Sequence, residues 1–263
     1  MPVTQWFAGD DVTVVDWWCP GAAIGSGPEE RAPAYELSVG RTGSHAIATR
    51  DGETVVDPTQ LLCLAAGETF RPVRRALGLD RRTRIALGDT AMAALVGDRA
   101  PGWRTRSIPM SAETALAHHA LLRAASAPTR DELALHTLAL DLAARACSAP
   151  AVARAPDANR ALRVAVREVR ERLVRDYAAP LTLTLLARHV GLSSWHLSRS
   201  FRALVGVGLH DYRNRVRLFA ALERLARPRR PPLAQLALDL GFCSHSHFTR
   251  AFRAFFGKPA SAL

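Results

Sequence analysis

The sequence has little lysine, few cysteines and no long apolar run, and each shortage excludes a class of protein. Lys258 is the one lysine among 35 basic residues, a bias toward arginine that genomic composition can produce. The four cysteines are far apart and form no C-x-x-C pair, so the sequence predicts neither a disulfide framework nor a zinc site. No apolar run approaches membrane-spanning length, and the N-terminus carries acids where a secretory signal carries positive charge. We therefore expect a cytoplasmic chain with no membrane partner and no cofactor.

Positive charge is concentrated in the C-terminal part. The 263 residues carry a net charge of +11. Residues 155–263 hold 19 lysines and arginines against 7 acidic residues, a net +12, whereas residues 1–154 hold 16 against 17, a net −1. A general preference for arginine does not explain this asymmetry. Basic charge confined to one helical region is typical of a surface that contacts the phosphates of nucleic acid.

A pattern of about 20 residues occurs twice in this basic region. Leu186 to Arg202 is repeated by Leu236 to Arg253, with an offset of 50 residues up to the first glycine and 51 after it, so one residue is inserted at or near Cys243. Each copy has apolar residues at helical spacing, a glycine suited to ending a helix and a serine suited to capping the next. The pattern predicts two helix-turn-helix units, at about 182–204 and 232–256.

The rest of the sequence has a part with short strand-like runs, followed by a part with helical periodicity. Short apolar runs broken by Gly, Pro or Asp predict the strands of an antiparallel sandwich or barrel, at 12–18, 35–39, 45–49, 54–56, 61–65 and 84–87. Helical periodicity follows at 111–125 and 129–147, with Ser111 and Thr129 as expected N-caps. Further amphipathic helices are expected at 159–177 and, between the repeats, at 209–226. These patterns divide the chain into a strand-rich part at 1–105, a helical segment at 106–150, a linker at 151–158 and a second helical part at 159–263.

The double unit resembles the DNA-binding domain of the AraC/XylS family of bacterial transcription regulators. "LTLTLLARHVGLSSWHLSRSFRALVG" is similar to the first unit of that family and "LAQLALDLGFCSHSHFTRAFRAFFGKP" to the second. The segment from Gly52 to Phe70 resembles the cupin-like jelly-roll sensor common in the family. The resemblance implies an α+β two-domain fold: an N-terminal cupin-like β-barrel followed by helices, and an all-α C-terminal domain. It also implies that residues 1–105 form an effector-sensing domain for a small molecule, that residues 106–150 form the dimerisation segment of a homodimer and that residues 159–263 bind promoter DNA on the nucleoid. A regulator of this family is expected to contact RNA polymerase and commonly activates transcription.

The resemblance places the second helix of each unit in the major groove. Arg199 and Arg250 are the best candidates for bidentate contact with guanine, because the guanidinium fork matches O6 and N7. Arg202 and Arg253 are expected to contact phosphates, which fixes position without reading sequence. The complete set of expected base contacts is Trp195, His196, Ser198 and Arg199 in the first unit and His245, Ser246, Thr249 and Arg250 in the second.

Several other groups have a structural interpretation and a functional one. Buried packing is favoured over a thiol or metal sensor for Cys19 and Cys63. Core packing competes with an effector pocket for four tryptophans, which are Trp6, Trp17, Trp18 and Trp103. Exposed loop charge is favoured over an acidic-effector site for Arg71, Arg74 and Arg75. A solvated face, or pairing with Asp211 or Glu223, is favoured for the linker-helix arginines, which are Arg213, Arg215 and Arg217.

Two alternatives to an effector-controlled regulator remain. One is a regulator without an effector, controlled by abundance or by a protein partner. The other is an enzyme, either a DNA-repair methyltransferase or a cupin enzyme fused to a DNA-binding unit. The first enzyme needs clustered cysteines and the second a set of histidines, whereas the barrel region contains only His45. The sequence therefore favours a protein without catalytic residues or a metal.

Overall fold

The computed structural model describes residues 3–19, 24–74, 80–97, 103, 105–150 and 159–263. It consists of two compact units, one formed by Met1–Ala151 with Leu222–Arg230 and the other by Val152–Ala221 with Pro231–Leu263. Helix α7 (Leu209–Leu225) contributes to both units. None of the helices in the described ranges is long and apolar enough to cross a membrane.

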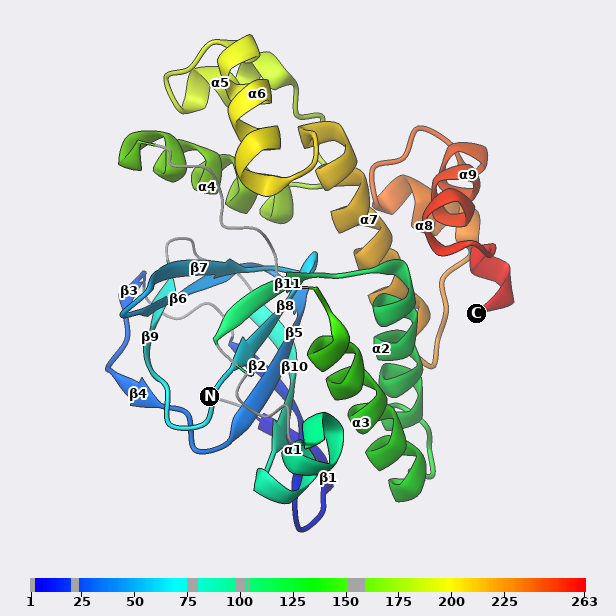
Figure 1. The fold of residues 1–263 in the computed structure, drawn as a ribbon. Coiled ribbons are helices and arrows are strands. Elements are labelled where there is room, and N and C mark those ends of the chain that lie inside the picture. Colours follow the sequence, from blue (N-terminus) through cyan, green and yellow to red (C-terminus); the bar gives the residue numbers. More distant parts are fainter. Residues whose placement is uncertain (1–2, 20–23, 75–79, 98–102, 104, 151–158) are drawn as a thin grey trace. The chain divides into compact units, whose positions relative to one another are not determined.

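The first unit contains two antiparallel sheets that face each other (Figure 1). One has the strand order β1 (Val3–Ala8), β2 (Val12–Cys19), β10 (Asp80–Leu87), β5 (Tyr35–Thr42), β8 (Gln60–Leu64) and β11 (Arg106–Pro109). The other has the order β3 (Gly25–Ser26), β9 (Thr69–Arg74), β6 (His45–Thr49) and β7 (Gly52–Val56), and β4 (Glu30–Arg31) also pairs with β9.

The predicted jelly-roll architecture is confirmed, with one difference in its closure. All six predicted strands are present, but no hydrogen-bonded pair of described strands joins the two sheets, which form an open sandwich and not a closed barrel. Strands β1, β3, β4, β9 and β11 and helix α1 (Asp89–Val96) were not predicted. Buried residues that include Ile47, Leu62 and Phe70 form a core cluster in this unit.

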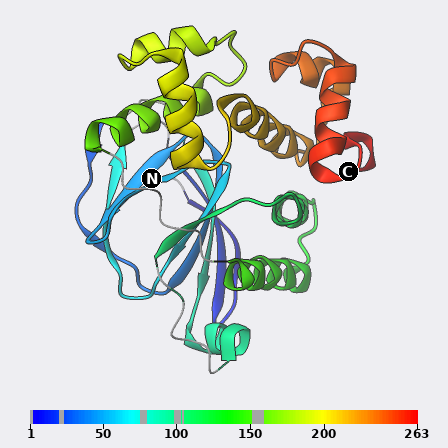
Figure 2. The same cartoon turned by 45° about the horizontal axis from the view of Figure 1, so that its top comes forward.

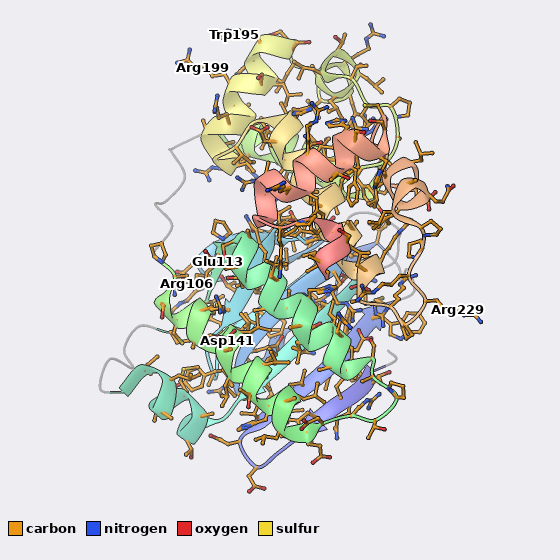
Figure 3. The ribbon with its side chains drawn as sticks, turned by 90° about the vertical axis from the view of Figure 1, so that its right-hand side faces the viewer. Arg106, Glu113, Asp141, Trp195, Arg199 and Arg229 are labelled. Atoms are coloured by element: carbon orange, nitrogen blue, oxygen red, sulfur yellow. The ribbon has the colours of Figure 1, made fainter. Side chains whose placement is uncertain are left out.

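Two antiparallel helices cover the outer face of the six-stranded sheet, and Figures 2 and 3 show them side by side. Helix α2 (Ala112–Ala125) begins at Ser111, whose side chain accepts a hydrogen bond from the backbone N–H of Thr114, as predicted. Helix α3 (Glu132–Ser148) begins at Asp131 and not at Thr129. Asp131 accepts from the N–H of Ala134, so the helix starts later than the sequence suggested.

The second unit is built from helices that bury apolar side chains on one face each. Helix α4 (Arg160–Arg175) begins at Asn159 and contributes Val166, Val169 and Leu173 to a core shared with Phe201 and Tyr212. The rings of Phe201 and Tyr212 pack edge to face, with centroids 5.4 Å apart. The sequence predicted that this helix is amphipathic, and its apolar side is the side that packs in the core.

Candidate nucleic-acid interface and barrel cavity

Both predicted helix-turn-helix units are present. The first consists of α5 (Leu183–His189) and α6 (Ser194–Val205), and the second of α8 (Leu233–Asp239) and α9 (His245–Phe256). The turn glycines Gly191 and Gly241 have φ of 67° and 81°, in the left-handed region that favours glycine. The cap serine follows Gly191 by two residues and Gly241 by three, which places the inserted residue in the second turn.

The second helix of each unit has a buried face and an exposed face. Leu197 and Phe201 on α6, and Phe248 and Phe252 on α9, are fully buried because residues four apart lie on the same side of a helix. The residues expected to contact DNA lie between or beside them. Nine are exposed and one, Thr249, is half-buried: Trp195, His196, Ser198, Arg199, Arg202, His245, Ser246, Thr249, Arg250 and Arg253.

The two arginines expected to read bases are available for a ligand. Neither Arg199 nor Arg250 forms an ion pair with another described residue. The Arg199 guanidinium lies 5.4 Å from the centre of the Trp195 ring, and both side chains project outward from α6 (Figure 3). Trp195 is 68% exposed, so its ring is accessible to a ligand. These side chains form an arginine-bearing surface on each second helix.

Two of the three linker-helix arginines, Arg213 and Arg217, do not belong to a solvated face, which corrects the sequence interpretation for them. Arg213 and Arg217 both donate from Nε to the carbonyl oxygen of Tyr177, each at 2.9 Å, and Arg213 also donates to Leu181. Burial lowers the pKa of Arg217 to about 10. These two arginines satisfy carbonyl groups in the turn after α4, so they stabilise the unit and are not free to pair with DNA.

Glu223 does not pair with those arginines either. Within the first unit it accepts hydrogen bonds from Arg41, whose Nε and Nη2 lie 2.8 and 2.6 Å from its carboxylate oxygens. Arg41 also donates from Nη1 to Asp16 at 2.7 Å. Burial raises the pKa of Glu223, but the charges of Arg41 and Arg81 outweigh it and keep the pKa below its usual range. Glu223 is therefore part of a buried ion-pair cluster.

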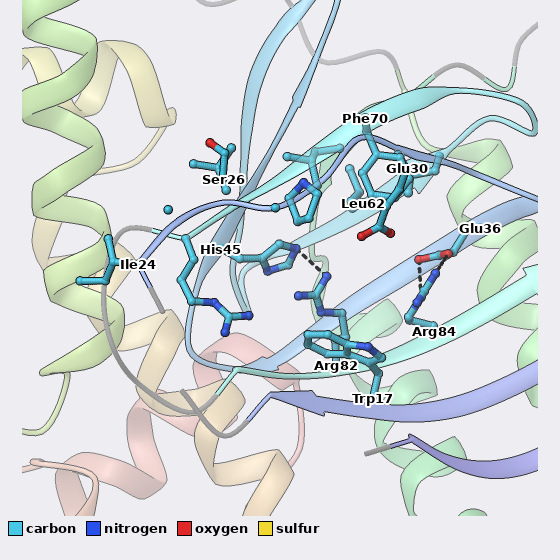
Figure 4. Close-up of a pocket in the computed structure, with 17 residues that line it drawn as sticks. Trp17, Ile24, Ser26, Glu30, Glu36, His45, Leu62, Phe70, Arg82 and Arg84 are labelled. Carbon is cyan, nitrogen blue, oxygen red and sulfur yellow. Dashed lines mark hydrogen bonds and ion pairs between the residues drawn. The ribbon is translucent and has the colours of Figure 1, made fainter. Parts of the chain in front are cut away.

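A cavity of about 380 Å³ lies in the first unit, lined by residues of both sheets (Figure 4). Among the tryptophans considered for a pocket, Trp17 lines this cavity, whereas Trp103 donates from Nε1 to the carbonyl of Leu64 at 2.8 Å. Arg71 is exposed and pairs with Glu29, as predicted, but it lies on strand β9 and not in a loop. The interpretation as exposed loop charge is wrong for Arg74, because Arg74 is the last residue of β9 and lines the cavity. Arg75 lies outside the described residues.

Two cavity arginines, Arg82 and Arg84, were missed in the sequence. They lie two apart on β10, so both face the cavity, whereas Thr83 and Ile85 between and after them are buried. The alternation of arginines with less polar residues from 82 to 85 is the signal that identifies them. It becomes informative only once this segment is known to be a strand with one face on a cavity.

The cysteines and histidines of the first unit do not form a metal site in the described residues, which contain no group of three or more ligands placed to hold an ion. Cys19 and Cys63 are buried and free of disulfide bonds. Burial raises the pKa of the Cys63 thiol to about 12, so it is protonated and unreactive at neutral pH.

The chain is similar to several known proteins. A family model described as "Helix-turn-helix domain" matches residues 186–263. The regulatory protein SoxS of Escherichia coli K12 is 37% identical over 82 residues, which cover 31% of this chain and 76% of SoxS. The transcriptional activator AarP of Providencia stuartii is 35% identical over 81 residues, 31% of this chain and 59% of AarP. The structure of the AraC-like transcriptional activator CuxR aligns with a TM-score of 0.43 at 17% identity, over 83% of this chain and 79% of CuxR.

Two helix-turn-helix units with basic outer faces define a DNA-binding protein. The similarity to SoxS identifies its kind: the chain belongs to the AraC/XylS family of DNA-binding transcription regulators.

Proposed function

We propose that this chain is a promoter-binding regulator whose first unit binds a small molecule that changes promoter binding. Activation is the commoner mode of regulation in the family, and the proposal adopts it. The observation that carries the DNA part is the matched pair Arg199 and Arg250. Both lie at the same place on the second helix of their units, exposed and without an ion-pair partner among the described residues. The observation that supports effector binding is the cavity between the two sheets, whose volume falls within the ~300–1,000 Å³ typical of small-molecule sites.

In this proposal the two units read different half-sites. At the offset of 51 residues that holds after the turn, Trp195 and His196 of the first recognition helix correspond to Ser246 and His247 of the second. An indole offers a large apolar surface to a thymine methyl, whereas a serine hydroxyl hydrogen-bonds with any of several base edges. The operator should therefore be a pair of unlike sequences.

The proposal also includes a homodimer formed through α2 and α3, contact with RNA polymerase and no catalytic activity. The dimer is supported by Leu133 on α3, whose side chain is 73% exposed beside the exposed Thr137 one turn later. In this proposal Leu133 is the apolar residue of α3 that a second copy would cover. The curated relatives are transcription regulators, and their similarity lies in the DNA-binding part.

Binding of the purified full chain to its own promoter region tests the DNA part. Affinity measured by fluorescence anisotropy should fall steeply with salt, since each phosphate contact contributes a slope of about −0.9 in log K against log salt. Arg250→Ala should cost about 1–3 kcal/mol and relax base preference at one position. Arg253→Ala is the matched control, because loss of a phosphate contact should weaken specific and random DNA alike. An unchanged ratio of specific to random affinity in Arg250→Ala would show that Arg250 does not read a base.

A further inference from the structure

The cavity in the first unit has a polar side and an apolar side. Figure 4 shows His45 and Arg82 directed toward each other on one side, and Leu62 beside Phe70 on the other. Ile47 and Leu64 add to the apolar lining. The ligand that fits this lining combines a polar group with a hydrocarbon body.

Positive charge is in excess on the polar side. Asp80 is the carboxylate that serves both Arg74 and Arg82: it accepts a short hydrogen bond from Arg82, and its Oδ2 lies 3.8 Å from Nη2 of Arg74. Arg74 otherwise donates to the thiol of Cys19, which is a weak acceptor. Burial raises the pKa of Asp80, but the charge of Arg82 and its hydrogen bond keep that pKa below its usual range, so Asp80 is ionised. One carboxylate therefore faces two guanidinium groups.

His45 does not supply a further charge. Nη1 of Arg82 lies 2.8 Å from Nε2 of His45, and because arginine can only donate, the imidazole nitrogen accepts. His45 is therefore neutral, with its proton on Nδ1, which lies 3.5 Å from Oδ2 of Asp80. Burial, together with the charge of Arg82, lowers the pKa of His45 and agrees with this state. Nε of Arg82 has no hydrogen-bond partner among the described residues.

Arg84, the third arginine that lines the cavity, already has an acidic partner. Arg84 donates through Nε and Nη2 to the two oxygens of Glu36, with the Nε contact at 2.8 Å. The hydrogen bond from Arg84 to Glu36 and the Coulomb attraction of Glu36 and Glu30 raise the pKa of Arg84, although burial opposes them. An anionic ligand is therefore drawn to the end of the cavity at Arg74 and Arg82, away from the two glutamates.

We infer that the effector is a small organic monocarboxylate, with its carboxylate at Arg74 and Arg82 and its apolar body against Leu62, Leu64 and Phe70. This inference rests on the proposed function, in which the cavity is the effector site. A carboxylate presents two oxygens in the plane that a guanidinium fork matches. A single negative charge balances the one excess positive charge, whereas a phosphate dianion would bring a second charge toward ionised Asp80.

The test uses the purified full chain and monocarboxylates from benzoate to decanoate, each paired with its neutral primary amide and its amine. Acids should raise the melting temperature and bind in calorimetry, and the matched amides and amines should not. Arg74→Met should weaken acid binding at least tenfold, since it removes a charged hydrogen-bond donor from a side chain that is 13% exposed. Arg71→Met is the control, because Arg71 is on the same strand, is 56% exposed and does not line the cavity.

Three results would overturn the inference: no acid binds, amides bind as well as acids, or an inorganic phosphate or phosphate ester competes better than any carboxylate. Binding to promoter DNA with and without each ligand is measured separately. If acids bind in the cavity but promoter affinity does not change, the ligand class stands and the proposed effector control fails. If a neutral compound alters promoter binding, effector control stands and the assigned class fails.

Discussion

Replacing Gly241 with alanine tests how the second helix-turn-helix unit packs. A Cβ atom built at this position would lie 2.6 Å from the carbonyl oxygen of Ala178 and 2.8 Å from both its Cα and Nη2 of Arg217. The first two of these atoms are backbone atoms of the turn after α4, so relieving the clash requires that turn to move away from α8. The carbonyl group of Tyr177, the preceding residue in the chain, accepts from Arg213 and Arg217 at 2.9 Å, which opposes such a movement.

The expected loss of stability has two parts. Gly241 has φ of 81°, and placing a side chain in the left-handed region costs about 1–2 kcal/mol. Overpacking a tight contact adds about 1–3 kcal/mol. The repeat supplies a matched control in Gly191, which has φ of 67° and no heavy atom within 4 Å of the place that a Cβ atom would occupy. Gly191→Ala should therefore cost only the first part.

The free energy of unfolding of each variant is measured by urea titration of the full chain, followed by circular dichroism at the helical band. Gly241→Ala should be less stable than Gly191→Ala by about 1–3 kcal/mol. For a unit of this size that difference lowers the melting temperature by several degrees, at about 4–8 °C per kcal/mol. Equal destabilisation by the two substitutions would refute the close contact between α8 and the turn after α4.

Two further predictions concern the first unit. His45 and His118 are buried and burial lowers the pKa of each below its ordinary value of 6.5, so the unfolded chain binds protons that the folded chain excludes. Stability should fall below about pH 6.5, by up to about 1.4 kcal/mol per pH unit for each histidine, and His118→Gln should reduce the slope in urea titrations at pH 5–7. Leu133→Glu should convert the proposed dimer to a folded monomer, measured by light scattering, and Thr137→Ser is the control that should leave the dimer intact. A wild-type chain that is monomeric at micromolar concentration would contradict the dimer.

The helix-turn-helix units were predictable because their signals are local. A serine that caps a helix and a glycine that ends one act within four residues, and Ser193, Ser244, Gly191 and Gly241 occupy those positions in the structure. The error at Thr129 has the same local origin. Thr129 and Asp131 both have side chains that can cap a helix, and Asp131 forms the cap.

Strands were less predictable, since a strand depends on a partner that the sequence does not name. Strand β9 contains Pro72 with Arg71 and Arg74 on either side, a composition that resembles a loop. It is a strand because it pairs with β6, where Ile47 lies opposite Pro72. The assignment of Arg74 to an exposed loop failed for this reason, and with it the first indication of the polar side of the cavity.

The main features of the DNA-binding half could be predicted from the sequence because they are local. Repetition and capping predicted two helix-turn-helix units, the net charge of +12 in residues 155–263 indicated contact with nucleic acid, and the family resemblance assigned ten residues to the second helices. Which arginines are available to a ligand depends instead on contacts that form only in the folded protein. Arg213 and Arg217 bind carbonyl groups, Arg84 pairs with Glu36, and Arg74 shares one carboxylate with Arg82. Every arginine carries the same charge in the sequence, and what it is able to bind depends on the acceptors that folding brings to it.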